Sequence, residues 1–156
     1  MSRYLSADIY YKEKYHEKVA RLSLSSGLSC PNRDGTLGNT GCIFCSKLGA
    51  GDFAANSKDS IKDQIESQIE FLKKKWNAKK YIAYFQSFTN TYGDVDYLRK
   101  IFYEAIEYPG VVGLTIATRA DCLSDEILEL LDELNKVTDL NIELGLQTVN
   151  EKTIEY

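Results

Sequence analysis

Short apolar runs alternate with helical patterns four times along this chain, and this alternation limits its fold more than any other feature of the sequence. The apolar runs cover residues 19–24, 81–85, 111–117 and 141–146. The helical patterns that follow them cover residues 57–76, 94–107 and 124–136, and a fourth begins at Asn150. Such alternation predicts a parallel sheet with helices packed outside it, joined by right-handed crossovers. We therefore expect an α/β fold built from βα units.

The helical segments are amphipathic and have recognisable ends. In segment 57–76, one face carries Ile61, Ile65, Ile69 and Leu72. Asn56 or Ser57 is the expected cap of this helix, and Ser124 is the expected cap of the third. The run 111–117 is almost continuously apolar, as expected of a strand that is covered on both faces.

Length and composition predict one domain with an ordinary core. The chain has 156 residues, of which 44% are hydrophobic and 27% charged, so it can bury a core without disulfides. Its formal net charge of −4 argues against a strongly basic surface, and we expect no DNA partner. The apolar runs are too short to cross a bilayer, and the N-terminus lacks an apolar signal core. We therefore expect a cytoplasmic protein with no membrane partner.

Three of the four cysteines crowd into one glycine-rich loop, residues 30–56, just past the carboxyl end of the first predicted strand. They are Cys30, Cys42 and Cys45, with the spacing C-x11-C-x2-C, while Cys122 stands alone. Structural disulfides are rare in a reducing compartment, so the crowding indicates metal or cluster binding. Parallel α/β folds carry their functional groups at the carboxyl ends of strands. We therefore expect the loop to form the active site.

The spacing leaves two kinds of site open. Three thiolates can hold a [4Fe–4S] cluster and leave one of its four irons free to chelate a small molecule. The alternative is a structural zinc site, which prefers four closed ligands and often two C-x2-C units. The chain has one such unit and one histidine, His16. Cys122 is a possible fourth ligand, although it follows a different strand and otherwise suits a small buried position.

The segment CPNRDGTLGNTGCIFCS, residues 30–46, resembles the cysteine loop of the radical S-adenosylmethionine (radical SAM) superfamily. More narrowly, it resembles the bacterial clade of uncharacterised radical SAM proteins related to the Elongator catalytic subunit. Three further segments match that clade in order: YFQSFTNTY (84–92), IATRADCLSDEIL (116–128) and IELGLQTVNEKTIEY (142–156). The resemblance covers nearly the whole chain. The combination is specific, whereas C-x2-C alone is common.

The resemblance implies a TIM-like (βα)6 barrel of the radical SAM type, of which about four βα units are present. Residues 1–156 would then be the N-terminal portion of a radical SAM core domain, with 1–18 as an extension and 19–156 as βα units. The last helical pattern has only just begun where the sequence stops, which would leave a sheet edge bare. We therefore expect a fragment of a longer protein.

The resemblance also implies the cofactors. Cys30, Cys42 and Cys45 would ligate a [4Fe–4S] cluster whose fourth iron binds S-adenosyl-L-methionine, with Phe44 near the adenine. An electron supplied by a reductant protein such as flavodoxin or ferredoxin would split the S–C5′ bond. The resulting 5′-deoxyadenosyl radical would abstract a hydrogen from the substrate, and the protein would supply position and shielding. Relatives in the Elongator branch act on wobble uridine, so tRNA is the expected substrate by analogy alone.

Two other loops offer candidate ligands. A typical radical SAM protein has a Gly-Gly-Glu motif after its second strand, where this chain has Gln86, Thr89 and Asn90. Their oxygens can accept from the cofactor ammonium, or they form a plain hydrogen-bonded loop. After the third strand, Arg119 can bind the cofactor carboxylate through its two-pronged guanidinium. A local pair with Asp121 is the alternative.

On the fourth predicted strand, Glu143, Gly145 and Gln147 share one face by the period of two. Two polar side chains in an apolar strand need partners. Ribose hydroxyls or a substrate would satisfy them, and the resemblance favours Gln147 for the ribose. A buried hydrogen-bond network is the alternative.

Two rivals to the radical SAM enzyme remain. One is a zinc-stabilised binding module, and the other is an inactive truncated product that keeps the cysteine loop without a closed site. A cluster of lysines is a possible contact for RNA phosphates or simply a solvated helix end: Lys73, Lys74, Lys75, Lys79 and Lys80.

Overall fold

The chain forms a parallel sheet of four strands, as the alternation predicted. The computed structural model describes residues 3–49 and 53–154. The strands are β1 (Val19–Leu24), β2 (Lys80–Phe85), β3 (Val111–Thr118) and β4 (Asp139–Leu144). They lie in the order β1-β2-β3-β4, and each neighbouring pair is parallel. The prediction of an α/β fold with alternating strands and helices is therefore confirmed.

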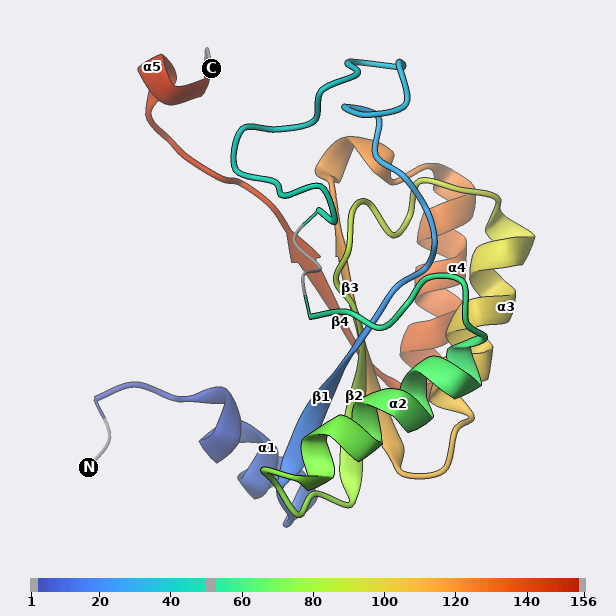
Figure 1. The fold of residues 1–156 in the computed structure, drawn as a ribbon. Coiled ribbons are helices and arrows are strands. Elements are labelled where there is room, and N and C mark those ends of the chain that lie inside the picture. The colour runs from blue at the N-terminus through green and yellow to red at the C-terminus, as the bar shows by residue number, and fades with distance from the viewer. Residues whose placement is uncertain (1–2, 50–52, 155–156) are drawn as a thin grey trace.

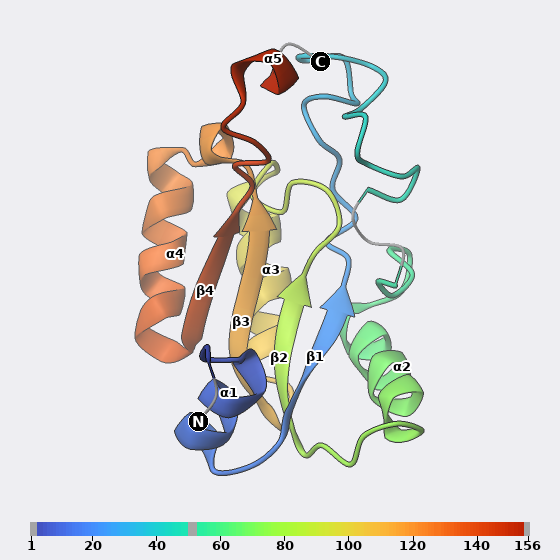
Figure 2. The same ribbon diagram turned by 90° about the vertical axis from the view of Figure 1, so that its left-hand side faces the viewer.

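Three helices cover one face of the sheet: α2 (Ile61–Lys73), α3 (Val95–Ile106) and α4 (Asp125–Val137). Figure 1 shows them on one side of the strands and α1 (Ala7–Tyr15) on the other, and in Figure 2 α1 lies in front of the sheet near the amino ends of the strands. Two short elements complete the fold, the 3-10 helix η1 (Ala120–Cys122) and α5 (Glu151–Ile154). No helix in the described part of the chain is long and apolar enough to cross a membrane.

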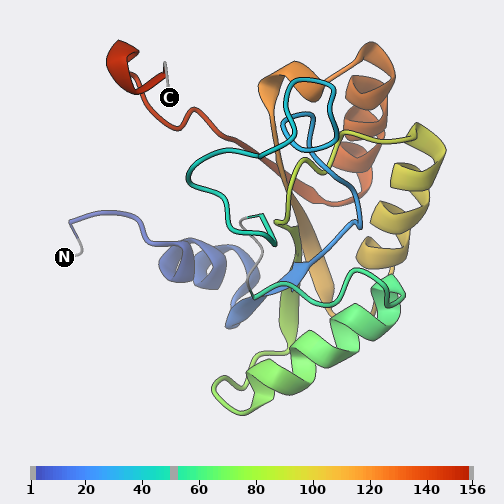
Figure 3. The ribbon, with the colours of Figure 1, turned by 45° about the horizontal axis from the view of Figure 1, so that its top comes forward.

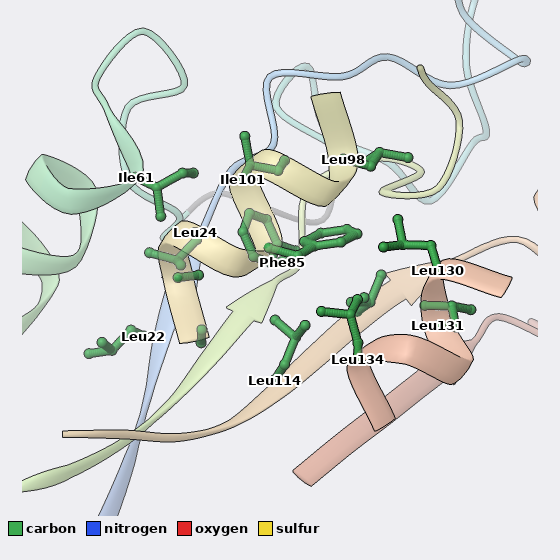
Figure 4. Packing of buried hydrophobic residues seen from close by; sticks show 14 of the residues in the cluster. Leu22, Leu24, Ile61, Phe85, Leu98, Ile101, Leu114, Leu130, Leu131 and Leu134 are labelled. Atoms are coloured by element: carbon green, nitrogen blue, oxygen red, sulfur yellow. The ribbon is translucent and has the colours of Figure 1, made fainter. Parts of the chain in front are cut away.

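The core fills the layer between the sheet and helices α2, α3 and α4 (Figure 4). Alternate strand residues point into this layer, including Leu22, Leu24, Ala83, Phe85, Leu114 and Ile116. The Phe85 ring meets Phe102 of α3 nearly edge-on, with 5.0 Å between ring centroids, a favoured aromatic geometry. We call this side of the sheet the helix-covered face.

The opposite side of the strands is mostly polar, and we call it the polar face. Because side chains alternate along a strand, it carries the residues between the core positions. The polar ones are Arg21, Ser23, Tyr84, Thr115, Asn141 and Glu143, and the apolar Ile82 and Ala117 lie on the same side. The sheet is curved about this face, since Arg21 of the edge strand β1 reaches Glu143 of the other edge strand β4. Residues 113–116 of β3 are buried throughout, as expected of a strand covered on both faces.

The start of α2 differs from the prediction. The helix begins at Ile61 rather than at residue 57, and its cap is Ser60, whose hydroxyl accepts from the Asp63 amide. Asn56 instead accepts from the Lys58 amide and forms a local turn. Asparagine and serine side chains favour both caps and turns, so the pattern alone did not separate the two. The cap at Ser124 is confirmed, because its hydroxyl accepts from the Ile127 amide.

Two further elements differ from the sequence-based expectation. Strand β4 covers 139–144 rather than 141–146, because its pairing with β3 begins at Asp139 opposite Gly113. Helix α1 was not predicted at all. It has no apolar stripe, and its contacts with the rest of the fold are made by tyrosine side chains, of which Tyr11 is buried and Tyr15 half-buried, and by Lys14, which pairs with Asp139. Ser6 caps its start by accepting from the Ile9 amide.

Candidate functional site

The cysteine loop follows β1 and lies over the carboxyl ends of the strands (Figures 1 and 3). Backbone hydrogen bonds fold it into successive turns. The carbonyl of Cys30 accepts from the Arg33 amide at 2.8 Å, and that of Asn32 accepts from the Gly41 amide at 2.8 Å. The Cys45 amide donates to the Cys42 carbonyl at 3.0 Å. These turns bring the ends of the cysteine pattern back toward one another.

All three thiols of the loop are free and half-buried. Burial raises the pKa of the Cys45 thiol above its usual range, and the Cys42 and Cys30 thiols raise it further, while Arg33 acts in the opposite direction. Both other thiols of the loop therefore act electrostatically on the thiol of Cys45. Among the described residues, no three His, Cys, Asp or Glu side chains are grouped so as to hold a metal ion.

Two residues inside the loop organise it, and the sequence-based search missed both. The Asn32 side-chain amide donates to the Cys42 sulfur at 2.9 Å. Arg33 donates to the Ser46 carbonyl at 2.5 Å, and its guanidinium lies 5.4 Å from the centroid of the Phe88 ring. Hydrogen bonds to thiolate sulfurs tune iron–sulfur centres, so the Asn32 contact bears directly on the candidate function. The signal available in the sequence was that both are polar residues close to Cys30.

The turn that follows the second strand packs beneath the cysteine loop. Phe88 has a positive φ of 62° and packs against Gly49, where an added Cβ would come within 3.1 Å of the Phe88 ring. The Thr89 amide donates to the Ser29 carbonyl. Across the loop, the hydroxyls of Thr36 and Tyr92 are hydrogen-bonded at 2.9 Å. These contacts fix the loop to the end of the sheet.

Of the predicted ligands after β2, Asn90 is held by hydrogen bonds within the fold. It is fully buried, and its amide nitrogen donates to the Phe85 and Ala117 carbonyls at 3.0 and 2.8 Å. Its oxygen accepts from the Ser26 hydroxyl at 2.6 Å. Asn90 thus ties together the ends of β1, β2 and β3. The ammonium-ligand role of Asn90 stays a prediction.

Gln86 and Thr89, the other two predicted ligands of this loop, differ in burial. Gln86 is half-buried, and its side chain makes no hydrogen bond within the described residues. Thr89 is buried, at 1% exposure. Gln86 is therefore the member of this group whose side-chain oxygen and amide are available to a ligand.

Arg119 forms the local pair that was the alternative to a cofactor contact. It donates to both carboxylate oxygens of Asp121, at 2.9 and 2.7 Å, and this pair holds its pKa above the usual range. Burial raises the pKa of the Cys122 thiol, and that sulfur is half-buried rather than fully buried as expected. The Cys30 thiol also raises the pKa values of Arg119 and Cys122 slightly.

Of the candidate residues predicted on the fourth strand, only Glu143 lies within β4, which ends at Leu144. Glu143 is in β4 and accepts hydrogen bonds from Arg21 and Tyr84 on the polar face. Gln147 lies beyond the strand with a positive φ of 65° and is exposed, so the period of two does not extend to it. Its amide nitrogen folds back to 2.3 Å from the point where a Cβ on Gly145 would lie. Phe44 is 60% exposed within the cysteine loop.

The donor set fits an iron–sulfur cluster. The irons of a [4Fe–4S] cluster take their thiolates at separate metal atoms, so the sulfurs need to be near one another without converging on a single ion. The loop supplies three free thiols, an amide that donates to the sulfur of Cys42 and a guanidinium that acts on the thiol of Cys45.

Comparison with known proteins gives relatives over nearly the whole chain, while no known family model matches it. The chain is 46% identical over 151 residues to the uncharacterized protein YtqA of Bacillus subtilis, an alignment that covers 97% of this chain and 47% of that protein. It is 41% identical over 142 residues to protein YhcC of Escherichia coli, covering 90% of this chain and 45% of YhcC.

An archaeal protein is also similar. The uncharacterized protein MJ0486 of Methanocaldococcus jannaschii is 38% identical over 150 residues, which cover 94% of this chain and 45% of MJ0486. The chain therefore spans about half the length of the curated relatives it matches.

Proposed function

We propose that the chain carries the cluster-binding part of a radical SAM enzyme, with Cys30, Cys42 and Cys45 as the ligands of a [4Fe–4S] cluster. The observation that carries the proposal is the placement of three free thiols in one loop over the carboxyl ends of a curved parallel sheet, with Asn32 donating to the sulfur of Cys42. When bound, such a cluster supplies the electron that cleaves S-adenosylmethionine to a 5′-deoxyadenosyl radical for hydrogen abstraction.

The residues of this chain would have distinct tasks in that function. The cysteine loop holds the cluster, and Asn32 donates to one of its sulfurs. Glu143 presents its carboxylate on the polar face and Gln86 is half-buried just past the end of β2, and the two side chains would orient the amino and ribose groups of the cofactor. Phe44, Thr89, Asn90, Arg119 and Gln147 remain predicted contacts of the cofactor.

The proposal extends to the architecture and partners. The curvature that lets β1 and β4 contact each other fits part of a (βα)6 barrel with the polar face inside it. A reductant protein such as flavodoxin or ferredoxin would deliver the electron. The proposed substrate is tRNA at the wobble uridine, and this last step rests on the resemblance to the Elongator branch.

The test is anaerobic reconstitution of the chain with iron and sulfide, followed by measurement of bound iron, bound sulfide and 5′-deoxyadenosine after reduction. We expect about four irons per chain and a brown protein that releases 5′-deoxyadenosine. Cys42→Ser is expected to lose the cluster, whereas Cys122→Ser, the matched control at the fourth cysteine, is expected to keep it. About one zinc per chain with no iron would establish the zinc-stabilised binding module instead. A cluster without 5′-deoxyadenosine would indicate an inactive product.

A further inference from the structure

The chain leaves β1 through residues 25–29, which lead directly to Cys30, and we call these residues the anchor segment. They form no helix or strand, yet Ser25 and Ser26 are buried. Buried backbone groups outside regular structure need hydrogen-bond partners from elsewhere in the fold. The partners of these two serines are side chains of other elements, so the position of the anchor segment depends on residues far from it in sequence.

Gln64 of α2 supplies the partners of Ser25. Its side-chain oxygen accepts from the Ser25 amide at 2.9 Å, and its side-chain nitrogen donates to the Ser25 carbonyl at 3.1 Å. The same nitrogen donates to the Asp59 carbonyl at 3.1 Å, and the side chain is buried. β1 is an edge strand of the described sheet, and α2 packs beside it (Figure 2). The Gln64 amide therefore binds Ser25 as a neighbouring strand would.

Ser26 is held from two sides. The Tyr97 hydroxyl of α3 donates to the Ser26 carbonyl at 2.7 Å, and the Ser26 hydroxyl donates to the Asn90 side-chain oxygen at 2.6 Å. The Thr89 amide then donates to the Ser29 carbonyl at 3.3 Å. The anchor segment is thus bound by α2, by α3 and by the turn after β2, up to the residue before the first cysteine.

Cys42 and Cys45 lie in a part of the loop with a different environment. Between them, Ile43 and Phe44 are 79% and 60% exposed. The hydrogen bonds of this turn within the described residues join it to the loop itself, as in the contact of the Asn32 amide with the Cys42 sulfur. The first cysteine is therefore attached to the core of the fold, whereas the other two are placed by the loop.

We propose that Gln64 and Tyr97 are positioning residues, which hold the anchor segment and thereby fix Cys30. The thiol of Cys30 is then the stationary ligand of the site, and the more exposed part of the loop brings the other two thiols to it. The role in cluster binding rests on the proposed function, whereas the fixed position of Cys30 does not. Fixing one ligand beforehand lowers the entropy cost of ordering the site.

The first test follows the thiols of the chain without a cluster. The reduced chain is treated anaerobically with iodoacetamide, and the alkylation rate of each cysteine is measured by mass spectrometry of its peptides. Gln64→Met keeps the length of the side chain and removes its hydrogen bonds to Ser25. We expect Cys30 to react about fivefold faster, while the other three cysteines change by less than about twofold.

Gln68→Met is the matched control, one turn further along α2. The Gln68 side chain also donates to a backbone carbonyl of the loop, that of Phe53 at 3.3 Å, but this contact lies after the cysteines. We expect all four thiols of this variant to react as they do in wild type.

A second pair of variants repeats the test from α3. Tyr97→Phe deletes the one oxygen atom that binds the Ser26 carbonyl, and we expect Cys30 alkylation to become about threefold faster. Tyr103→Phe is its control, because the Tyr103 hydroxyl makes no hydrogen bond within the described residues. If Gln64→Met does not fold, this pair decides.

The third test follows the cluster. After anaerobic reconstitution, iron release to a chelator and the electron paramagnetic resonance spectrum of the reduced cluster are compared in wild type, Gln64→Met and Gln68→Met. We expect Gln64→Met to release iron about tenfold faster and to show shifted g-values, because one ligand has lost its fixed position. Gln68→Met is expected to match wild type, and thermal unfolding of each variant shows whether the change is local.

The outcomes separate this inference from the proposed function. Unchanged Cys30 alkylation in both Gln64→Met and Tyr97→Phe would refute the positioning role and leave the proposed function intact, and so would an equal rise at all four cysteines in Tyr97→Phe. A selective rise at Cys30 with unchanged iron release would overturn its role as the stationary ligand. A wild-type chain that binds no iron would remove the proposed function, and a selective rise at Cys30 would still support its fixed position.

Discussion

The two faces of the sheet use the same strands for different purposes. The helix-covered face is apolar and closed, with Leu22, Phe85, Leu114 and Ile116 at 0% exposure. The polar face places Arg21, Tyr84, Thr115 and Glu143 on the residues that alternate with them. One face supplies burial of apolar surface, which stabilises the fold. The other presents charges and hydroxyls, which contribute much less to stability.

The contrast shows why the role of the polar side of a strand is hard to recognise from the sequence. A strand that alternates leucine with arginine or serine has the same pattern whether its polar side faces solvent or the interior of a barrel. Here the curvature of the sheet turns the polar side inward and brings Arg21 and Glu143 together across two intervening strands. Substitutions on the two faces should therefore have separable effects, and the following predictions are arranged from the largest effect to the smallest.

The largest effect is expected from Phe85→Ala on the helix-covered face. The side chain is fully buried against Phe102, and its removal leaves a cavity in the main core. We expect the free energy of unfolding, measured by urea titration, to fall by about 3–5 kcal/mol. Tyr84→Phe, at the adjacent residue on the polar face, is the control and should lose ~1 kcal/mol or less. Equal losses at the two residues would show that the faces do not differ as described.

An intermediate effect is expected from Asp139→Asn, where α1 closes the amino end of the polar face. Burial acts to raise the pKa of Asp139, but hydrogen bonds from Lys14 and Tyr15 outweigh it and hold the pKa below the ordinary 3.8. The carboxylate therefore stabilises the fold above pH 3.8, and this contribution is lost as the pH falls through the lowered value. We expect the variant to lose about 1 kcal/mol at pH 7.

The measurement that checks this is thermal unfolding across pH 2 to 7 for wild type and Asp139→Asn. The difference in unfolding temperature between the two proteins should shrink toward low pH, where the wild-type carboxylate is protonated. Asp132→Asn is a matched control, since that carboxylate pairs with Lys136 on the exposed surface of α4. If the difference in unfolding temperature between Asp139→Asn and wild type stays constant down to the lowest pH, the Asp139 carboxylate does not have the stabilising role described here.

The smallest effect is expected from Thr115→Val on the polar face. Valine has nearly the same shape and removes a buried hydroxyl that has no partner in the described part of the chain. Because an unsatisfied buried polar group is costly, we expect stability to rise by up to about 1 kcal/mol. Thr118→Val is the control, since that hydroxyl is hydrogen-bonded to Thr91 and its loss should destabilise. Destabilisation by Thr115→Val would mean that the hydroxyl is satisfied by bound water or ligand.

Much of the fold was predictable because it follows from local patterns. Strand Val19–Leu24 has the predicted bounds, and α3 lies between the expected ends at Asp94 and Glu107. The errors fall where local signals compete. Asn56, Ser57 and Ser60 are all plausible caps, and only packing selected Ser60. Helix α1 was missed because tyrosine side chains and the Lys14 ammonium, rather than an apolar stripe, attach it to the sheet.

The candidate site divides in the same way. The cysteine loop was identified from spacing, since ligand residues close in sequence leave a local signature. Asn32, Arg33 and Gln64 were not identified, because the role of each depends on which partner its side chain reaches in the folded chain. Gln64, for example, is a buried helix residue whose amide binds both the amide and the carbonyl of Ser25 at the end of β1. Nothing in its sequence neighbours indicates that partner.

By itself, the sequence determined the alternation of strands and helices, the face of each helix that is buried and the place of the cysteines after the first strand. These follow from periodicity and spacing within about 30 residues. Only the tertiary structure decided that Arg21 meets Glu143, 122 residues further along the chain, and that Tyr84 donates to the same carboxylate. The physical reason is that such contacts depend on sheet curvature and strand register, which arise from the packing of the whole domain rather than from any one segment.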